Sequence, residues 1–342
     1  MILLTELDTC KSTSSFLQSQ MWGEFKSLFG WTAKSFGIDW GEQGSGSLLV
    51  LCRKLAPGFS FAYVPWGPEL PVGAECSAQE LRELAKQLKP FLPRNTVFIR
   101  FDLPWFVNEE NKIDDSLLPA VLKRGTPVQA PDTVIIDLSK SSEDILAAMK
   151  PKWRYNISLA TKKGVQVSVN CTADNEQLEI FYSLLKETAK RDGIAVHGID
   201  YYKTLFDVCK KFNECNLHLY TAVHEGDTLS AIIVLFYGKC ATYLYGASSN
   251  NKRNLMAPYA LQWRAMQDAK EKDCLHYDLF GIPPNDDPNH PMAGLYRFKT
   301  GFGGQIKHRP GCWDFPYKKS IYSFFRIAET FRKKLLDLKK KK

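Results

Sequence analysis

Apolar residues recur along this chain with two spacings, one typical of strands and one typical of helices. Short apolar and aromatic runs bounded by turn residues predict strands at residues 47–54, 59–64, 96–101, 133–138, 165–169, 217–224, 228–237, 241–247 and 275–279. Apolar residues three and four positions apart predict helices at residues 16–29, 77–88, 142–163, 175–191 and 257–272, another beginning near residue 197, and one over the last twenty residues. Strands and helices in this order, used twice, indicate an α/β or α+β fold in which helices flank mixed sheets.

Two features interrupt this regular pattern. Pro151 falls inside the helical pattern of residues 142–163, so we expect either two helices or one bent helix there. Residues 277–302 open as a strand, break at Gly281 into a loop rich in Pro, Asn and Asp, and end on an apolar, aromatic and basic run at residues 295–299. Loops longer than about 12 to 15 residues are uncommon unless they are functional or disordered. The pattern leaves open whether this loop is a surface excursion or one wall of a site.

Length and composition bound the class of protein. A chain of 342 residues with 44% hydrophobic and 24% charged residues is globular and long enough for two domains, each with its own core. The nine cysteines include no CxxC pair and no zinc-binding spacing, so we expect free thiols in a reducing compartment. The N-terminus lacks the pattern of a signal peptide, and no apolar run reaches the roughly 18 to 20 residues of a membrane span. These features predict a cytoplasmic protein.

Several common chemistries have no motif in this sequence. It contains no Walker-type phosphate loop, no GxGxxG after a strand, no GxSxG and no HExxH. The six histidines are too far apart to suggest a metal cluster. We therefore expect neither a metal nor a cofactor.

Most of the net charge of +8 lies at the C-terminus. Residues 331–342 hold seven basic residues against Asp337 alone, and the rest of the chain has a net charge of +2. Apolar residues at helical spacing lead into this lysine run, which predicts an amphipathic helix. Such a helix can dock on the protein core, on an anionic membrane surface or against RNA. We favour a helix docked on the core, and peripheral contact with the inner face of the membrane remains open.

A second basic segment contains interleaved aromatic residues, Trp153 and Tyr155. Such a face suits contact with RNA or phosphate, and it equally suits a solvated helix surface. Its five basic residues are Lys150, Lys152, Arg154, Lys162 and Lys163.

Short motifs spread over nearly the whole chain lie at residues 22–26, 100–102, 152–157, 160–165, 190–193, 201–202, 257–259, 277–282 and 295–302. In these motifs the chain resembles the Fem family, the tRNA-dependent aminoacyltransferases FemA, FemB and FemX that build the interpeptide bridges of peptidoglycan. The resemblance implies two tandem GNAT-like acyltransferase domains, with residues 1–143 and 314–342 in the first and residues 144–313 in the second. The segment between Arg191 and Leu217 is too short for the coiled-coil arm of some members, so the chain resembles the arm-less FemX type.

The resemblance also implies a reaction and roles for individual residues. An amine on the stem peptide of a peptidoglycan precursor, UDP-linked or lipid-linked, would attack the amino acid esterified to tRNA. Lys299, packed behind Phe298, matches the family lysine that holds the developing oxyanion. Asp102 matches the aspartate that would orient or deprotonate the incoming amine.

Further positions match residues of the precursor site. Lys26 matches the lysine that binds the nucleotide diphosphate, and Tyr201 and Tyr259 match tyrosines that line the site. His197 departs from the family pattern, because the arm-less type carries a phosphate-binding arginine there and a neutral histidine is a poorer diphosphate ligand. This departure leaves a lipid-linked precursor open.

Two other functions remain open from the residues. The same fold could transfer an acyl or aminoacyl group to a lipid head group or to a protein amine. A non-catalytic tRNA-binding module would need only the basic face and the lysine tail, but Lys26, Asp102 and Lys299 occur together, which favours the enzyme. The sequence leaves the oligomeric state open, and we favour a monomer.

Overall fold

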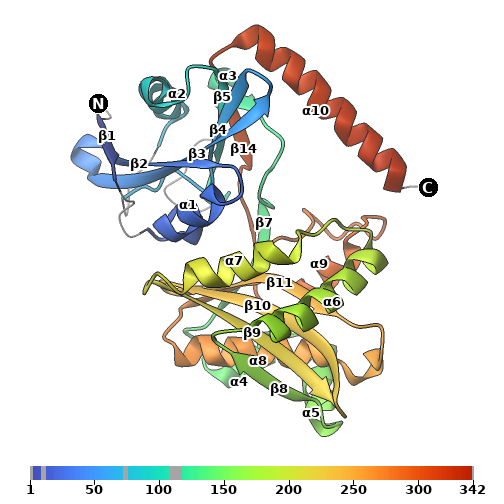
Figure 1. The fold of residues 1–342 in the computed structure, drawn as a ribbon. Helices are drawn as coiled ribbons and strands as arrows, with labels where there is room; N and C mark the ends of the chain where they lie inside the picture. The colour runs from blue at the N-terminus through green and yellow to red at the C-terminus, as the bar shows by residue number, and fades with distance from the viewer. Residues whose placement is uncertain (1–2, 9–12, 72–75, 108–117, 341–342) are drawn as a thin grey trace. The chain divides into compact units, whose positions relative to one another are not determined.

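The computed structural model describes residues 3–8, 13–71, 76–107 and 118–340. It contains two compact units, each with its own sheet and its own core. Unit 1 consists of Met1–Pro131 and Arg309–Lys342, and unit 2 consists of Asp132–His308 (Figure 1). No helix among the described residues is both long enough and apolar enough to cross a bilayer.

The part of unit 1 that the structure describes contains one sheet with the strand order β1-β2-β3-β4-β5-β14-β6. The strands are β1 (Leu3–Leu7), β2 (Thr32–Asp39), β3 (Ser45–Ala56), β4 (Phe59–Val64), β5 (Thr96–Asp102), β14 (Cys312–Pro316) and β6 (Lys123–Arg124). Neighbouring strands are antiparallel except for β4 and β5, which are parallel. Every residue of β5 is buried, so this strand lies at the centre of the unit.

The helices of unit 1 pack around this sheet. They are η1 (Phe16–Gln18), α1 (Gln20–Ser27), η2 (Gly41–Gln43), α2 (Ala78–Leu88), η3 (Lys89–Phe91), α3 (Leu118–Val121) and α10 (Lys319–Lys340). A capping box starts α2, because the Ser77 hydroxyl accepts from the Glu80 N–H and the Glu80 carboxylate accepts from the Ser77 N–H. The apolar side of α2 then joins the core under the sheet.

Unit 2 contains a second sheet, with the order β13-β7-β12-β11-β10-β9-β8 among its described residues. The strands are β13 (Gln305–His308), β7 (Asp132–Asp137), β12 (His276–Asp278), β11 (Cys240–Ser248), β10 (Asp227–Tyr237), β9 (Cys215–His224) and β8 (Gln166–Asn170). Only β11 and β12 are a parallel pair among these neighbours. The helices are α4 (Ser142–Ala148), α5 (Pro151–Lys162), α6 (Asn175–Asp192), α7 (Ile199–Cys209), η4 (Arg253–Leu255), α8 (Ala257–Glu271) and α9 (Ala293–Thr300).

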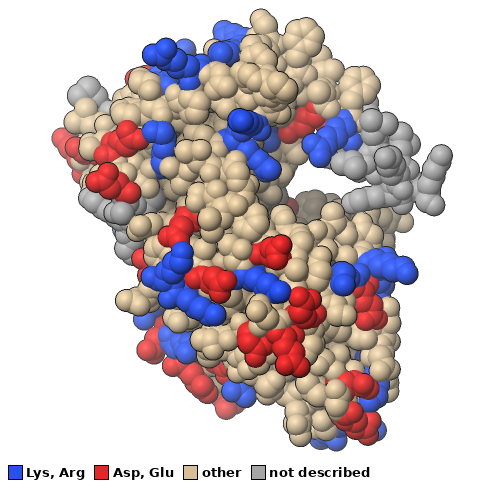
Figure 2. Space-filling model, viewed as in Figure 1, with Lys and Arg blue, Asp and Glu red and all other residues tan. Residues whose placement is uncertain are grey.

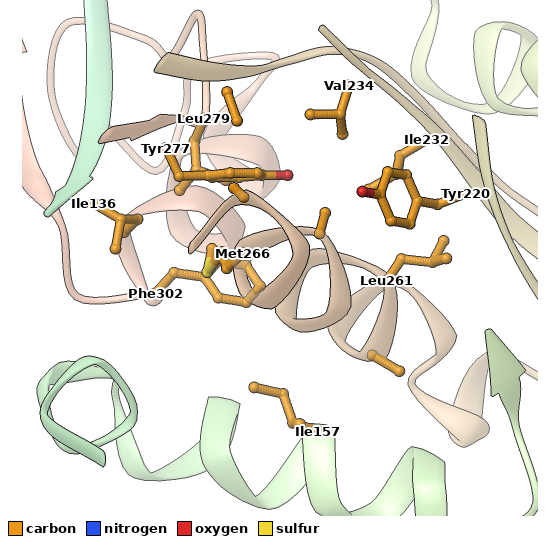
Figure 3. Packing of buried hydrophobic residues seen from close by; sticks show 14 of the residues in the cluster. Ile136, Ile157, Tyr220, Ile232, Val234, Leu261, Met266, Tyr277, Leu279 and Phe302 are labelled. Carbon is orange, nitrogen blue, oxygen red and sulfur yellow. The ribbon is translucent and has the colours of Figure 1, made fainter. Parts of the chain in front are cut away.

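The main core of unit 2 lies between the sheet and helices α5 and α8. Figure 3 shows Tyr220, Ile232 and Val234 of the sheet on one side of this core. Leu261 and Met266 come from α8 on the other side. These side chains are almost completely removed from water, so the sheet and α8 form a rigid support for the loops at the sheet's edge.

Two strands occupy corresponding places in the two sheets although they come from different parts of the chain. In unit 1, β5 is flanked by its parallel partner β4 and by the antiparallel β14. In unit 2, β12 is flanked by its parallel partner β11 and by the antiparallel β7. The boundaries between the units fall at 131/132 and 308/309, whereas the domains implied by the resemblance meet at 143/144 and 313/314. The difference arises because an apolar run indicates a strand but not the sheet in which it pairs.

The structure confirms one local prediction and corrects another. The pattern of residues 142–163 forms two helices, α4 and α5, and Pro151 is the first residue of the second. The segment that carries Lys299 was expected to be a loop, and this was wrong, because it is the helix α9. Strands β1, β2, β6, β13 and β14 were not predicted from the sequence.

Candidate active site

A pocket of about 1060 Å³ lies within unit 2. Its walls come from the connection between α6 and α7, from β11, from the start of α8 and from α9. Four residues singled out in the sequence line it, namely His197, Tyr259, Phe298 and Lys299. The structure thus brings together residues that are about 100 positions apart in the chain.

Lys299 is the buried cation of this pocket. Only 6% of it is exposed, and its Nζ donates to the carbonyl oxygens of Phe280 (3.0 Å) and Gly281 (2.9 Å). Burial lowers the pKa of Lys299 to about 7, and the nearby charge of Asp278 opposes this shift. The Nζ also lies 5.1 Å from the centre of the Tyr243 ring. The ammonium is therefore fixed in place, and the charge of Asp278 favours its protonated form.

Asp278 shapes the backbone that holds Lys299. Its Oδ1 accepts hydrogen bonds from the Phe280 N–H (2.8 Å) and from the Thr133 hydroxyl. Phe280 has a φ of 57°, a conformation that non-glycine residues seldom adopt. This turn, stabilised by the hydrogen bond that Asp278 accepts, presents the carbonyl oxygens of Phe280 and Gly281 to the Lys299 ammonium.

Changing Asp278 to Asn should lower activity at neutral pH and move the optimum of the kcat/KM profile to lower pH. The amide Oδ1 can still accept from the Phe280 N–H, but the negative charge that raises the pKa of Lys299 is gone. The lysine then loses its proton at a lower pH, so the alkaline limb of the kcat/KM profile should move to lower pH. The measurement is the pH dependence of kcat/KM for both proteins. A uniform loss at every pH would mean that Asp278 only supports the fold.

The aromatic residue next to Lys299 is held from two sides. The Phe298 ring contacts the Tyr259 ring at 5.3 Å, and Trp153 donates its Nε1–H to the Phe298 carbonyl (2.8 Å). Trp153 also packs against the backbone of Gly301, where an added Cβ would lie 2.1 Å from the indole. Residue 301 must therefore be glycine, and a shift of α9 would disturb its contacts with α5 and α8.

His197 and Tyr201 form a stacked pair at the entry to α7. Their ring centres are 3.8 Å apart with an interplanar angle of 10°. Tyr201 is buried, and burial raises its pKa, whereas His197 is exposed and lines the pocket. The neighbouring Tyr202 also lines the pocket. His197 thus presents an imidazole ring, stacked on Tyr201, at the position where the resemblance leads one to expect an arginine.

Asp102 lies in unit 1, at the end of β5, in the place that Asp278 occupies at the end of β12. It is completely buried, and its Oδ2 accepts from the Tyr63 hydroxyl (2.9 Å) and from the Gln129 N–H (3.2 Å). Its Oδ1 has no hydrogen-bond partner among the described residues. Burial raises the pKa of Asp102 to about 6, although both hydrogen bonds oppose the shift. This carboxyl group can therefore exchange a proton near neutral pH.

Lys26 also lies in unit 1, near the end of α1. Its Nζ is 5.5 to 5.9 Å from the ring centres of Trp22, Phe25 and Trp31. Burial, with a smaller contribution from the charge of Arg53, lowers the pKa of Lys26 to about 8. The side chain is enclosed by aromatic rings, so it does not simply extend into solvent from the helix edge.

The basic residues around α5 have different surroundings. Lys150, Lys152, Lys162 and Lys163 are exposed. Arg154 instead donates to the carbonyl oxygens at the end of α4, which satisfies acceptors that the helix leaves unpaired. Its proposed contact with RNA stays a prediction, as it does for the four lysines.

Sequence reasoning missed Tyr243, which lines the pocket, and two residues that support it, Asp278 and Trp153. Asp278 belongs to a quoted motif, but it was interpreted only as the end of a strand. Trp153 was assigned to a surface because it alternates with basic residues, whereas its indole turns inward to α9. Tyr243 gave no signal beyond a strand pattern. Among the described residues, no group of three His, Cys, Asp or Glu side chains is placed to hold a metal ion.

The two sheets, each with a single described parallel pair, define a tandem GNAT-type fold. A solved tandem GNAT protein from the clavulanic acid biosynthesis pathway has a TM-score of 0.51 and 13% identity, covering 92% of this chain and 98% of that one. A crystal structure of FemX has a TM-score of 0.77 and 21% identity, covering 91% of this chain and 94% of that one. At these identities the likeness establishes the fold.

The chain belongs to the FemAB family, whose family model matches residues 7–118, 121–222 and 214–330. Two curated relatives are both lipid II:glycine glycyltransferases. The protein from Staphylococcus saprophyticus is 24% identical over 394 residues, and the one from Staphylococcus aureus strain USA300 is 22% identical over 399. Each match covers 94% of this chain and 92% of the relative. The predicted family, fold class and enzyme class, an aminoacyltransferase, are confirmed by these matches.

Proposed function

We propose that this protein transfers an amino acid from aminoacyl-tRNA to an amine on the stem peptide of a peptidoglycan precursor. The observation that carries the proposal is the buried ammonium of Lys299, fixed by two carbonyl oxygens at the wall of a large pocket. The curated relatives are named for glycyl transfer to lipid II, a precursor of this kind. Family membership and the buried cation thus support the same chemistry.

The reaction needs no covalent enzyme intermediate, because the tRNA ester is already activated. The nitrogen of the acceptor amine attacks the ester carbonyl, and a C–N bond forms while the carbonyl oxygen becomes negatively charged. Lys299 stabilises this oxyanion in a site where water is largely excluded, so its charge acts more strongly than it would in solution. The C–O bond to the ribose then breaks, and the tRNA hydroxyl leaves with a proton.

The acceptor amine must lose a proton before or during the attack. We assign this step to Asp102, the buried carboxyl group whose pKa is raised toward neutrality. A base with a pKa of about 6 is mostly ionised at neutral pH and can still be protonated transiently. Phe298 acts as the wall that keeps Lys299 and the reacting ester aligned.

We also assign substrate-binding roles to residues that match the family motifs. Lys26 would contact the phosphates of the precursor, and His197, Tyr201 and Tyr259 would line its site. The exposed lysines of the α5 region would attract the tRNA backbone. Both substrates are handled in the cytoplasm, where charged tRNA is made, and the protein works as a monomer without a cofactor.

The choice between acceptors is tested by offering each one separately. Purified protein is incubated with a panel of charged tRNAs and with either UDP-linked or lipid-linked precursor. Because the residue at 197 is histidine, we expect the lipid-linked form to be the better substrate by kcat/KM. Transfer to the UDP-linked form with equal or higher kcat/KM would contradict this assignment. If the protein transferred the amino acid only to a phospholipid head group or to a protein amine, that group would be the acceptor and the peptidoglycan precursor would not.

A further inference from the structure

Helix α10 has two apolar sides, and the sheet of unit 1 covers only one. Tyr322 and Phe325 pack on Phe98 of β5, with ring centres 5.3 and 5.0 Å apart. The Tyr322 hydroxyl also donates to Asp314 (2.9 Å), and Arg100 pairs with Glu329 (3.3 Å). These contacts confirm the expected docking of the first half of the helix.

The other side of α10 carries large apolar side chains that lie in water. Phe324 is 75% exposed, Ile327 55% and Phe331 62%. At about 100° per residue these three fall within an arc of roughly 60°, nearly opposite Tyr322 and Phe325. Core docking therefore does not account for them. They form a continuous strip, here called the outer strip and defined as Phe324, Ile327 and Phe331.

The net positive charge of the chain is concentrated in the segment that contains this strip. Residues 318–342 hold ten basic and two acidic residues, and the remaining chain holds 35 of each, so this segment carries the whole net charge of +8. Of its two acidic residues, Glu329 is already paired with Arg100 and Arg326. Over the face shown in Figure 2, in contrast, Lys and Arg are interspersed with Asp and Glu.

The helical spacing of apolar residues continues toward the C-terminus in the sequence. In the sequence, Leu335 and Leu338 follow Phe331 by four and seven positions, which is helical spacing, and basic residues flank them. In Figure 1 the second half of α10 projects beyond the sheet of unit 1. An apolar strip bordered by many basic residues and few acidic ones is the composition of a helix that lies in a membrane interface.

We propose that the outer strip of α10 inserts into the surface of an anionic lipid bilayer, with the surrounding basic residues contacting the phosphate head groups. Charge complementarity selects an anionic surface. The strip distinguishes a bilayer from RNA, because RNA would satisfy the basic residues and leave the outer strip in water. A second copy of the chain would bring two strongly basic helices together, which is unfavourable.

The test is sedimentation of the full-length protein with vesicles. One set contains phosphatidylcholine alone, and the other contains equal parts of phosphatidylcholine and phosphatidylglycerol. The protein should bind the anionic vesicles and not the neutral ones, and added salt should weaken binding. Binding to neither set, or equally to both, would overturn the proposal.

The double variant Phe324→Gln with Phe331→Gln separates the outer strip from the charge. Both side chains are exposed, so the fold should be retained, and vesicle binding should fall by roughly tenfold. Leu28→Gln is the matched control, because Leu28 is 59% exposed on another part of unit 1 and should bind as the unchanged protein does. If the double variant bound vesicles as well as the unchanged protein, the outer strip would not contact lipid. The same conclusion would follow if the double variant lost only its affinity for deacylated tRNA. Transfer to the UDP-linked acceptor should be equal in all three proteins, which separates this proposal from failure of the active site.

Discussion

Replacing Lys299 with Met should reduce kcat by roughly 100- to 1000-fold, the loss expected when one stabilising group for an oxyanion is removed. Methionine fills similar space without the charge. It removes the cost of burying an ammonium but leaves the carbonyl oxygens of Phe280 and Gly281 without this donor, so we expect the fold to be retained. Binding of the precursor should stay within a few-fold of the original. The measurements are single-turnover transfer and precursor affinity.

Lys186→Met is the control for this result. Lys186 lies on α6, is exposed and does not line the pocket, so its loss should leave kcat unchanged. Near-normal turnover by the Lys299 variant would show that the reaction does not depend on this cation. Equal losses in both variants would indicate a general effect of reduced positive charge.

Replacing Asp102 with Asn should reduce kcat/KM by roughly 100-fold or more, because an amide cannot take the proton of the acceptor amine. The Asn Oδ1 can still accept from the Tyr63 hydroxyl and the Gln129 N–H, so the local structure should be kept. Tyr63→Phe is the matched control, since it removes one bond to Asp102 but leaves the carboxylate. It should lose much less activity.

The pH profile gives this prediction a second readout. In the unchanged protein the base must be ionised, so kcat/KM should fall below a pKa of about 6. The lysine must be protonated, so kcat/KM should also fall above a pKa of about 7. The Asn variant should lose only the acid limb. If the acid limb persists in that variant, another group is the base, and a rise of activity into the alkaline range would mean that Lys299 acts without its proton.

Much of the fold could be predicted because local patterns determine it. The hairpin of β9 and β10 and the helices α6 and α8 follow directly from apolar spacing and turn residues. The partners of β7 and of β14 could not be predicted. Strand β7 pairs with β12 and β14 pairs with β5, and both partners are distant in sequence. The helical state of α9 was also missed, since the Pro- and Asn-rich residues before it obscure the short apolar spacing.

The candidate site, too, could be predicted only in part from the sequence. The resemblance identified Lys299 and Asp102 by type, but only the structure gives the buried environment that moves their pKa values toward neutrality. Asp278 was visible as a motif residue, yet its contact with the Phe280 N–H depends on a turn with a positive φ. The contacts of the Lys299 Nζ with the carbonyl oxygens of Phe280 and Gly281, 19 and 18 positions earlier in the chain, have no local signal in the sequence.

The most direct test of the central claim is the mass of the precursor after incubation with the protein and a charged tRNA. We predict an increase equal to one or more amino-acid residues on the stem peptide. The increase should disappear when the tRNA is deacylated beforehand, and free amino acid with ATP should not replace it. No increase with any charged tRNA, or an increase with free amino acid and ATP alone, would contradict the account.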